Sequence, residues 1–227
     1  MKSLVIDSAA SCMVIAAKNE NLTATLSLDI GMKQSQKILP AIDYVLEQVG
    51  LSSSELDFTA LTSGPGTFTG LRLAFSALKA IELAHEVPIY GIPSLDAYAY
   101  PFREFGEVVV SVIDAKKNQF FAAVYKNGEC ILPAEDTTAE KISAFLKSTI
   151  GNGEKIIVVG PDAKIFSGEL KENGIEDAKF LSSQPNATDS LSEIAESMIE
   201  QKKEPLKDYD GPIYLRKSEA EIALENK

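Results

Sequence analysis

Histidine, tryptophan, arginine and cysteine are all scarce in this sequence of 227 residues, which has a single histidine and no tryptophan. A histidine-rich metal site, or a Ser-His-Asp or Cys-His arrangement, could be built only through His85. This residue follows an alanine-rich helical run, where a cation complements the dipole of a helix C-terminus. The sequence therefore predicts no catalytic residue and no metal site.

Basic surface is equally scarce, because the net charge is −11 and the only arginines are Arg72, Arg103 and Arg216. This balance argues against a protein that binds nucleic acid by itself, which needs a broad basic face.

Long apolar runs are missing as well, so the sequence predicts no membrane span and no signal peptide, and hence a cytoplasmic protein. The two cysteines, Cys12 and Cys130, stand beside apolar strand-like residues and are predicted to be small buried thiols in a reducing compartment.

What is present is a pattern of elements that occurs twice. The first half predicts three strands, a helix, a strand and a helix over residues 4–7, 12–17, 22–28, 38–49, 58–62 and 67–84. The second half repeats this order over residues 108–114, 120–125, 130–132, 137–146, 156–159 and 191–199. Pro40 is expected near the first turn of its helix, and Thr137 with Glu140 is expected to form a capping box.

This duplication predicts an α/β fold of two similar sub-domains, with mixed sheets flanked by helices, facing one another across a cleft. The predicted boundaries are 1–103 and 104–227, with a reduced second sub-domain that ends in a C-terminal tail. Residues 101–106 are the expected hinge.

The most informative motif is the stretch Gly64-Pro65-Gly66-Thr67-Phe68-Thr69-Gly70 between a strand and a helix. Backbone N–H groups at such a helix start can bind an anion. The spacing is nevertheless neither a dinucleotide fingerprint nor a P-loop. The alternative is a packing turn, in which Gly64 and Gly66 adopt positive φ, Thr67 or Thr69 caps the helix, and Gly70 allows close approach.

Two aspartates, each at the end of a first strand, are weak candidates for nucleotide binding. Asp7 with Ser8 and Asp114 with Lys116 could hold a metal–phosphate assembly in the turn that follows each strand. The alternative is that each aspartate caps its own turn. Because neither turn contains glycine, we expect no bound cofactor.

Five segments together carry a resemblance to a known family. In chain order they are Leu4 to Ser8, Ile38 to Pro40, Gly64 to Arg72, Val112 to Lys117 and Pro212 to Arg216. They resemble the bacterial TsaB (YeaZ) proteins. That family is similar to the TsaD-type enzymes of the actin, sugar-kinase and Hsp70 superfamily. The resemblance therefore implies two sub-domains of the RNase H-like type, which agrees with the duplicated pattern.

The resemblance implies a scaffold that binds and activates a TsaD-type enzyme for threonylcarbamoyl modification of the adenosine 3′ of the anticodon, in transfer RNAs reading codons that start with A. It further implies a heterodimer with TsaD, a homodimer when the chain is alone, contact with transfer RNA only through the complex, and a TsaE-type ATPase as a further partner. Ser94 and Tyr98 stand where the enzyme has two metal-binding histidines, which favours a non-catalytic subunit.

The alternative function is an ATP-using enzyme of the sugar-kinase type, which needs glycine-rich phosphate turns. The partner surface is predicted on the two helices of the first half, with small alanine side chains turned toward another helix. The predicted partner-binding residues are Ile38, Ile42, Val45, Leu71, Ala74, Ala77, Leu78 and Ile81.

Overall fold

The chain folds as two compact units, each built around a five-stranded sheet. The computed structural model describes residues 1–105, 107–151, 153–180 and 186–216. The first unit comprises residues 1–97 and 186–213, and the second comprises 98–185 and 214–227. Among the described residues no helix is long and apolar enough to cross a membrane.

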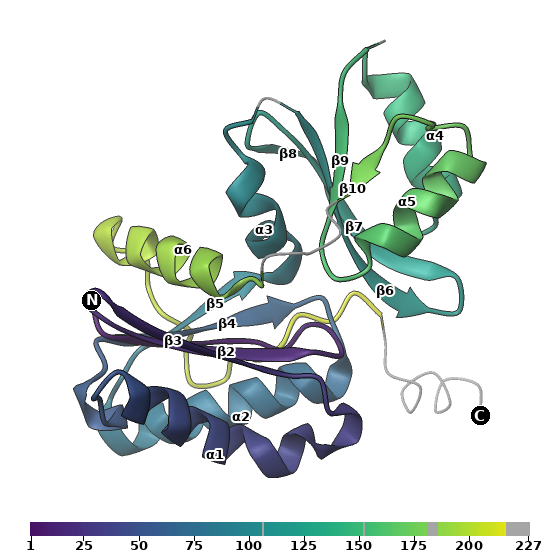
Figure 1. The fold of residues 1–227 in the computed structure, drawn as a ribbon. Coiled ribbons are helices and arrows are strands. Elements are labelled where there is room, and N and C mark those ends of the chain that lie inside the picture. The colour runs from purple at the N-terminus through teal and green to yellow at the C-terminus, as the bar shows by residue number, and fades with distance from the viewer. Residues whose placement is uncertain (106, 152, 181–185, 217–227) are drawn as a thin grey trace. The chain divides into compact units, whose positions relative to one another are not determined.

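The first unit carries a sheet of order β3-β2-β1-β4-β5. Its strands are β1 (Ser3–Asp7), β2 (Met13–Asn19), β3 (Leu22–Leu28), β4 (Phe58–Gly64) and β5 (Ile89–Pro93). The β1, β2 and β3 strands form an antiparallel meander, whereas β4 runs parallel to β1 and β5 parallel to β4. The α1 (Gln34–Gln48) and α2 (Phe68–His85) helices cover one face, and α6 (Thr188–Glu200) covers the other (Figure 1).

The core of this unit lies between the sheet and the α1–α2 layer. Ile38, Ile42 and Val45 lie on one stripe of α1 and are buried against Leu4, Ile6, Met13 and Ile15 of the central strands. Pro40 is exposed and stands inside α1 rather than in its first turn, because the helix begins earlier than predicted, at Gln34. Its side chain is exposed, and the helix lacks one backbone N–H donor at this position.

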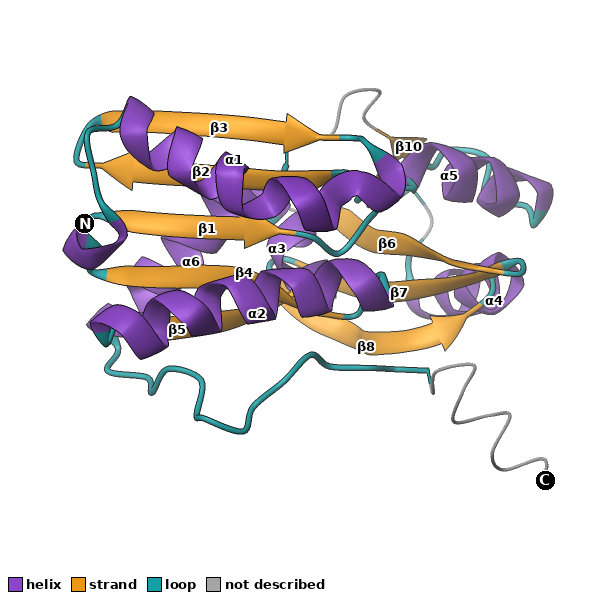
Figure 2. Ribbon diagram, turned by 90° about the horizontal axis from the view of Figure 1, so that it is seen from below, coloured by secondary structure: helices purple, strands orange, loops and turns teal. Residues whose placement is uncertain are grey.

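The segment after α6 stays in the first unit and runs beside β5 and the end of β4. The Leu206 N–H donates to the carbonyl of Ile89 at 2.8 Å, and the Ile213 N–H donates to the carbonyl of Ser63 at 2.7 Å. The side chain of Leu206 approaches Gly91, where a methyl group would lie 3.0 Å from it. Figure 2 shows this segment running past β5 and α2.

The second unit repeats the first in a reduced form, with a sheet of order β10-β9-β6-β7-β8. Its strands are β6 (Val108–Lys116), β7 (Gln119–Lys126), β8 (Glu129–Thr137), β9 (Ile156–Val159) and β10 (Lys179–Phe180), and its helices are α4 (Ala139–Thr149) and α5 (Ala163–Glu172). Four short helices complete the two units, and they span Gly31–Lys33, Ser53–Glu55, Ser94–Ala99 (α3) and Tyr100–Phe102 among the described residues. The core packs Phe120 of β7 edge-on against Phe166 of α5, with ring centroids 4.8 Å apart.

The predicted fold class is confirmed, but several predictions about individual elements are wrong. The helix at the second unit's glycine turn is α5, which the sequence analysis missed, whereas the predicted last helix is α6 and packs on the first sheet. The observed units therefore differ from the predicted division at residue 103. The N-cap of α4 is Thr138, whose hydroxyl accepts from the Lys141 N–H, so no capping box forms at Thr137.

Cys130 is exposed and Cys12 is half-buried, so the prediction of two buried thiols is wrong. Cys130 lies in β8, an outer strand of its sheet. Partial burial and the nearby Asp29 and Asp7 carboxylates raise the pKa of Cys12, which disfavours its reactive thiolate form. Gly106, at the end of the predicted hinge, lies outside the described residues.

Candidate functional site

The glycine turn of the first unit packs against the loop that follows β1. A methyl group on Gly66 would lie 2.5 Å from the carbonyl oxygen of Ala9, and one on Gly70 would collide with the carbonyl oxygen of Ser8. The Thr67 N–H, at the N-cap of α2, donates to the Ala9 carbonyl at 2.7 Å. The loop after β1 therefore directs its carbonyl oxygens at the start of α2, where a bound phosphate would need N–H donors.

This geometry favours the packing interpretation of the motif, with two differences. Gly64 has a φ of +117°, as predicted, but Gly66 does not have a positive φ. Thr67 is the N-cap residue, yet its hydroxyl makes no capping bond and instead donates to the Ser8 carbonyl at 3.3 Å. The close approach predicted at Gly70 is confirmed.

Asp7 uses its carboxylate within its own turn. Its Oδ1 accepts from the Ala9 N–H at 3.3 Å and from the Thr62 hydroxyl at 3.4 Å, while the Thr62 hydroxyl oxygen accepts from the Ser8 N–H at 3.1 Å. Asp7 and Ser8 are both buried, and the Ser8 hydroxyl has no hydrogen-bond partner among the described residues. The interpretation of Asp7 as a turn-capping residue is confirmed.

In the second unit, the Asp114 carboxylate likewise accepts hydrogen bonds from its own turn. Its carboxylate accepts from the backbone N–H of Lys116 at 2.7 Å and from the Lys116 Nζ at 2.6 Å. The hydrogen bond to Asp114 raises the pKa of Lys116. Lys116, Lys117 and Asn118 all have positive φ, so the β6–β7 hairpin turns through three consecutive left-handed residues.

Asp162 adds a third charged group to this turn. Its Oδ2 accepts from the Asp114 N–H at 2.7 Å, and burial raises the pKa of Asp162, with a further contribution from the Asp114 carboxylate. The Gly160 that precedes it has a φ of +102° and lies against the Val112 carbonyl, as Gly64 lies against Ile213 in the first unit. Asp7 and Ser8 thus belong to one unit, and Asp114 and Lys116 to the other.

Ser94 is fully buried at the start of α3, and its hydroxyl oxygen accepts from the Gly64 N–H at 3.2 Å. This hydroxyl therefore helps to hold the glycine turn in place. Across the described residues no group of three or more His, Cys, Asp or Glu side chains could hold a metal ion. His85 is exposed in the last turn of α2, as expected for a residue that complements the helix dipole.

The predicted partner-binding residues do not form a surface of this unit. Seven of them are buried in its own interior, and Ile81 is partly buried. Ala74 is fully buried and Ala77 is 6% exposed, so the prediction that these alanines face outward is wrong. The reason is that α2 packs against both the sheet and α1, so a wider stripe of the helix is covered than a single sheet-facing stripe requires.

The outward faces of α1 and α2 carry a different set of apolar side chains. Leu39 and Tyr44 of α1 are 59% and 51% exposed, and Phe68 and Leu83 of α2 are 37% and 84% exposed. Ala80 is also exposed on α2. The sequence pattern did not single out these exposed side chains as a surface.

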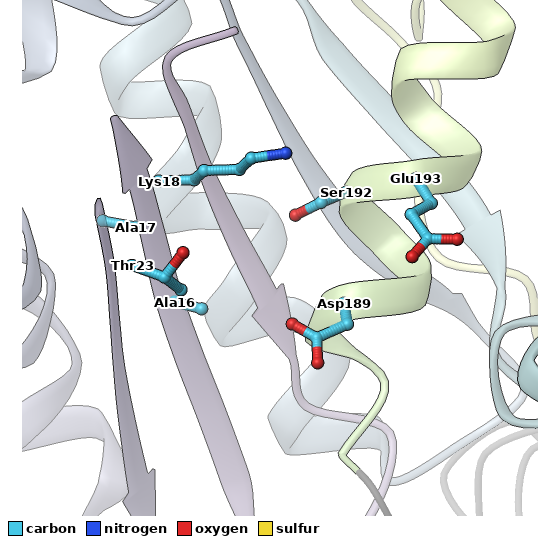
Figure 3. A pocket seen from close by; sticks show the side chains of 7 residues that line it. All are labelled: Ala16, Ala17, Lys18, Thr23, Asp189, Ser192 and Glu193. Atoms are coloured by element: carbon cyan, nitrogen blue, oxygen red, sulfur yellow. The ribbon is translucent and has the colours of Figure 1, made fainter. Parts of the chain in front are cut away.

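One cavity of about 240 Å³ opens between α6 and the β2–β3 hairpin (Figure 3). Lys18 and Thr23 line it from the strands, and Asp189, Ser192 and Glu193 line it from α6. Lys18 also lies 3.3 Å from the Glu196 carboxylate. None of the predicted site residues lines this cavity. Local sequence patterns do not indicate it, because its two walls come from opposite ends of the chain.

Comparison with known proteins identifies the family. A family model described as "TsaD: tRNA N6-adenosine threonylcarbamoyltransferase" matches residues 31–224. The chain is 28% identical to the tRNA threonylcarbamoyladenosine biosynthesis protein TsaB of Escherichia coli (strain K12), over the full length of both proteins. The chain belongs to the TsaB (YeaZ) family.

Other TsaB relatives extend this similarity. The Bacillus subtilis (strain 168) TsaB is 25% identical and covers 97% of this chain and 96% of its own length. The solved structure of YeaZ from Pseudomonas aeruginosa superposes with a TM-score of 0.75 at 23% identity, covering 94% of this chain and 99% of that one. The TsaB family assignment thus applies to both units.

Proposed function

We propose that this chain works in the biosynthesis of tRNA threonylcarbamoyladenosine as a non-catalytic subunit that binds and activates a TsaD-type enzyme. The observation that carries the proposal is that polar groups of both candidate nucleotide turns are already hydrogen-bonded within this chain. In the first unit the Ala9 carbonyl accepts from the N-cap of α2, and in the second unit the Asp114 carboxylate accepts from Lys116. Together with the TsaB names of its relatives, this favours binding of an enzyme over chemistry of its own.

The outward faces of α1 and α2 are the proposed contact with the TsaD-type enzyme. They present Leu39, Tyr44 and Leu83, three large apolar side chains that are each more than half exposed. Exposed apolar side chains on neighbouring helices fit a partner that contributes helices of its own. Transfer RNA is then met only through the complex, because the net charge of −11 repels phosphates. A TsaE-type ATPase is proposed as a further partner.

Calorimetry with the purified TsaD of the same cell tests this contact. Leu39→Glu and Leu83→Glu are expected to weaken binding at least tenfold, since each buries an unpaired charge in the contact. Ile165→Glu is the matched control, because Ile165 is 57% exposed on α5 of the second unit. Wild-type affinity in both helix variants would contradict the proposed surface.

A reconstituted modification assay separates the two functions. The chain without TsaD is expected to modify no transfer RNA, and addition of TsaD should restore modification. Modification of transfer RNA without TsaD would contradict the non-catalytic role. A rise in the melting temperature of the chain with ATP would instead support the sugar-kinase alternative, because a ligand that binds only the folded state stabilises it.

A further inference from the structure

The cavity between α6 and the β2–β3 hairpin lies wholly within the first unit. Its volume of about 240 Å³ is several times the roughly 30 Å³ that one water molecule occupies, so it has room for a small organic ligand. Ala16 of β2 adds a short apolar side chain to the polar groups that line it. The cavity therefore combines polar and apolar walls, as binding sites for small molecules do.

Ser192 of α6 has a polar side chain that the fold leaves unsatisfied. The residue is only 9% exposed, and it makes no hydrogen bond to any residue that the structure describes. Figure 3 shows its hydroxyl group pointing from α6 toward the strands, into the cavity. Because buried hydroxyl groups are nearly always hydrogen-bonded, this one is available to a ligand in the cavity.

Two carboxylates line the cavity beside this hydroxyl. Ser192 and Glu193 stand three and four residues after Asp189, so both side chains neighbour that of Asp189 on the helix surface. Within the described part of the chain, neither carboxylate has an ion-pair or hydrogen-bond partner. The dipole of α6 favours Asp189 in the first turn, but Glu193 lies beyond that turn, and like charges four residues apart destabilise a helix. A cation in the cavity would relieve this repulsion.

Lys18 does not supply that cation, because Glu196 holds its ammonium group further along α6. The Lys18 Nζ lies 3.3 Å from the Glu196 Oε1, and the amino group of Met1 lies 3.7 Å from the same oxygen. Lys18 thus neutralises Glu196 and leaves Asp189 and Glu193 uncompensated. Since Lys18 also lines the cavity, it would repel a ligand that carried a second positive charge.

We propose that this cavity binds a small aliphatic amine with one primary ammonium group. Such a group has three N–H donors, and Asp189, Ser192 and Glu193 offer it three acceptors from one side of α6. Two of these acceptors are charged, and hydrogen bonds between ionised groups are the stronger kind. The aliphatic stem would lie against Ala16. Among the described residues no group of three or more His, Cys, Asp or Glu could hold a metal ion, which favours an organic cation.

This site is separate from the proposed contact with a TsaD-type enzyme. That contact uses α1 and α2, which cover one face of the first sheet, whereas α6 and the cavity lie on the other face (Figure 1). Variants of α6 can therefore test amine binding without altering the proposed enzyme contact, so the two proposals can fail independently.

An NMR titration of the isotope-labelled full chain with butylammonium chloride tests the site. We expect saturable shifts of backbone amide signals, confined to α6 and the β2–β3 hairpin. 1-Butanol has the same stem without the charge, and tetramethylammonium has the charge without N–H donors, so each should bind at least about fivefold more weakly. Shifts that do not saturate or that lie elsewhere would overturn the proposal. Equal affinity for tetramethylammonium would also overturn it, because attraction to an acidic chain would then suffice.

Two substitutions with opposite expected effects test the named residues in the same titration. Glu193→Gln should weaken butylammonium binding at least about fivefold, because a neutral amide oxygen replaces a charged acceptor. Lys18→Gln should strengthen binding about twofold or more, because it removes a positive charge beside the site, and damage to the fold would not produce a gain.

Glu172→Gln is the matched control, since it makes the same change on the exposed end of α5 in the second unit and should bind as the wild type does. A Glu193→Gln variant with wild-type affinity, or a Lys18→Gln variant that binds no more tightly than the wild type, would overturn the proposed site.

Discussion

The guanidinium group of Arg216 binds the carboxylate of Asp136 through two parallel hydrogen bonds. Nε donates to Oδ2 at 2.7 Å and Nη2 to Oδ1 at 2.8 Å, while Nη1 donates to the Ala115 carbonyl at 2.8 Å. This fork ties the last described residue of the chain to β6 and β8 of the second unit. Both side chains are about one quarter to one third exposed, so solvent weakens the pair without removing it.

A double-mutant cycle on Arg216→Ala and Asp136→Asn is expected to give a coupling energy of about 1 kcal/mol, in the range of partly exposed bidentate pairs. Urea unfolding of the four proteins measures it. Arg216→Lys should keep the charge but lose the fork, and should fall between the wild type and Arg216→Ala. A coupling energy indistinguishable from zero would mean that the tail is held by other contacts.

The glycine turn gives a second prediction. Gly66→Ala and Gly70→Ala should each destabilise the chain by about 2 kcal/mol or more, because the added methyl group meets the backbone carbonyl oxygens of Ala9 and Ser8, which cannot move aside freely. Gly168→Ala is the control. It lies in α5 with no atom within 4 Å of the added methyl group, and should stabilise the chain by up to about 1 kcal/mol. Thermal unfolding measures the stability of the three variants. The packing interpretation would be contradicted if Gly66→Ala and Gly70→Ala were as stable as Gly168→Ala.

Ala77 and Ala80 of α2 test which alanines of this helix are buried in the unit and which are exposed on its surface. Ala77→Glu should cost several kcal/mol of unfolding free energy, because Ala77 is 6% exposed and an unpaired carboxylate would enter the core. Ala80→Glu should change stability by no more than about 0.5 kcal/mol, since Ala80 is exposed. Circular dichroism during heating measures both. Equal stability of the two variants would mean that α2 does not bury its alanines.

Asp162 gives a prediction about pH. Its pKa is raised in the folded chain, chiefly by burial, so the native state holds the proton more tightly than the unfolded chain does. Stability from this group is therefore present below the ordinary pKa of an aspartate and is lost as the pH rises through the raised value. Asp162→Asn removes this loss, and its amide oxygen can still accept from the Asp114 N–H.

The stability of Asp162→Asn relative to the wild type should thus improve as the pH increases from below 4 to 7, because an aspartate has an ordinary pKa of 3.8 and burial shifts that of Asp162 upward. Denaturant unfolding at several pH values measures the difference. Glu172→Gln, on the exposed end of α5, is the control variant. A difference that stays constant or narrows with pH would show that Asp162 is not destabilised by its charge.

Local patterns in the sequence were enough to predict most strands, the two similar units and part of the turn chemistry. The strand patterns predicted β1 to β4 and β6 to β9, because buried strands leave apolar runs or alternation that a short window contains. The repeated order of elements predicted two similar units, and the turn chemistry of Asp7 and the close approach at Gly70 followed from residue type alone.

Only the tertiary structure decided which surface each element covers. Helix α6 is amphipathic by itself, yet it packs on the first sheet and not on the second, because its partner lies far away in the sequence. The inward position of Ala77, the exposure of Cys130 and the pairing of Arg216 with Asp136 depend likewise on residues distant along the chain. Periodicity gives an element its apolar side, whereas burial depends on the neighbour that meets that side, and this neighbour is fixed by the packing of the whole unit.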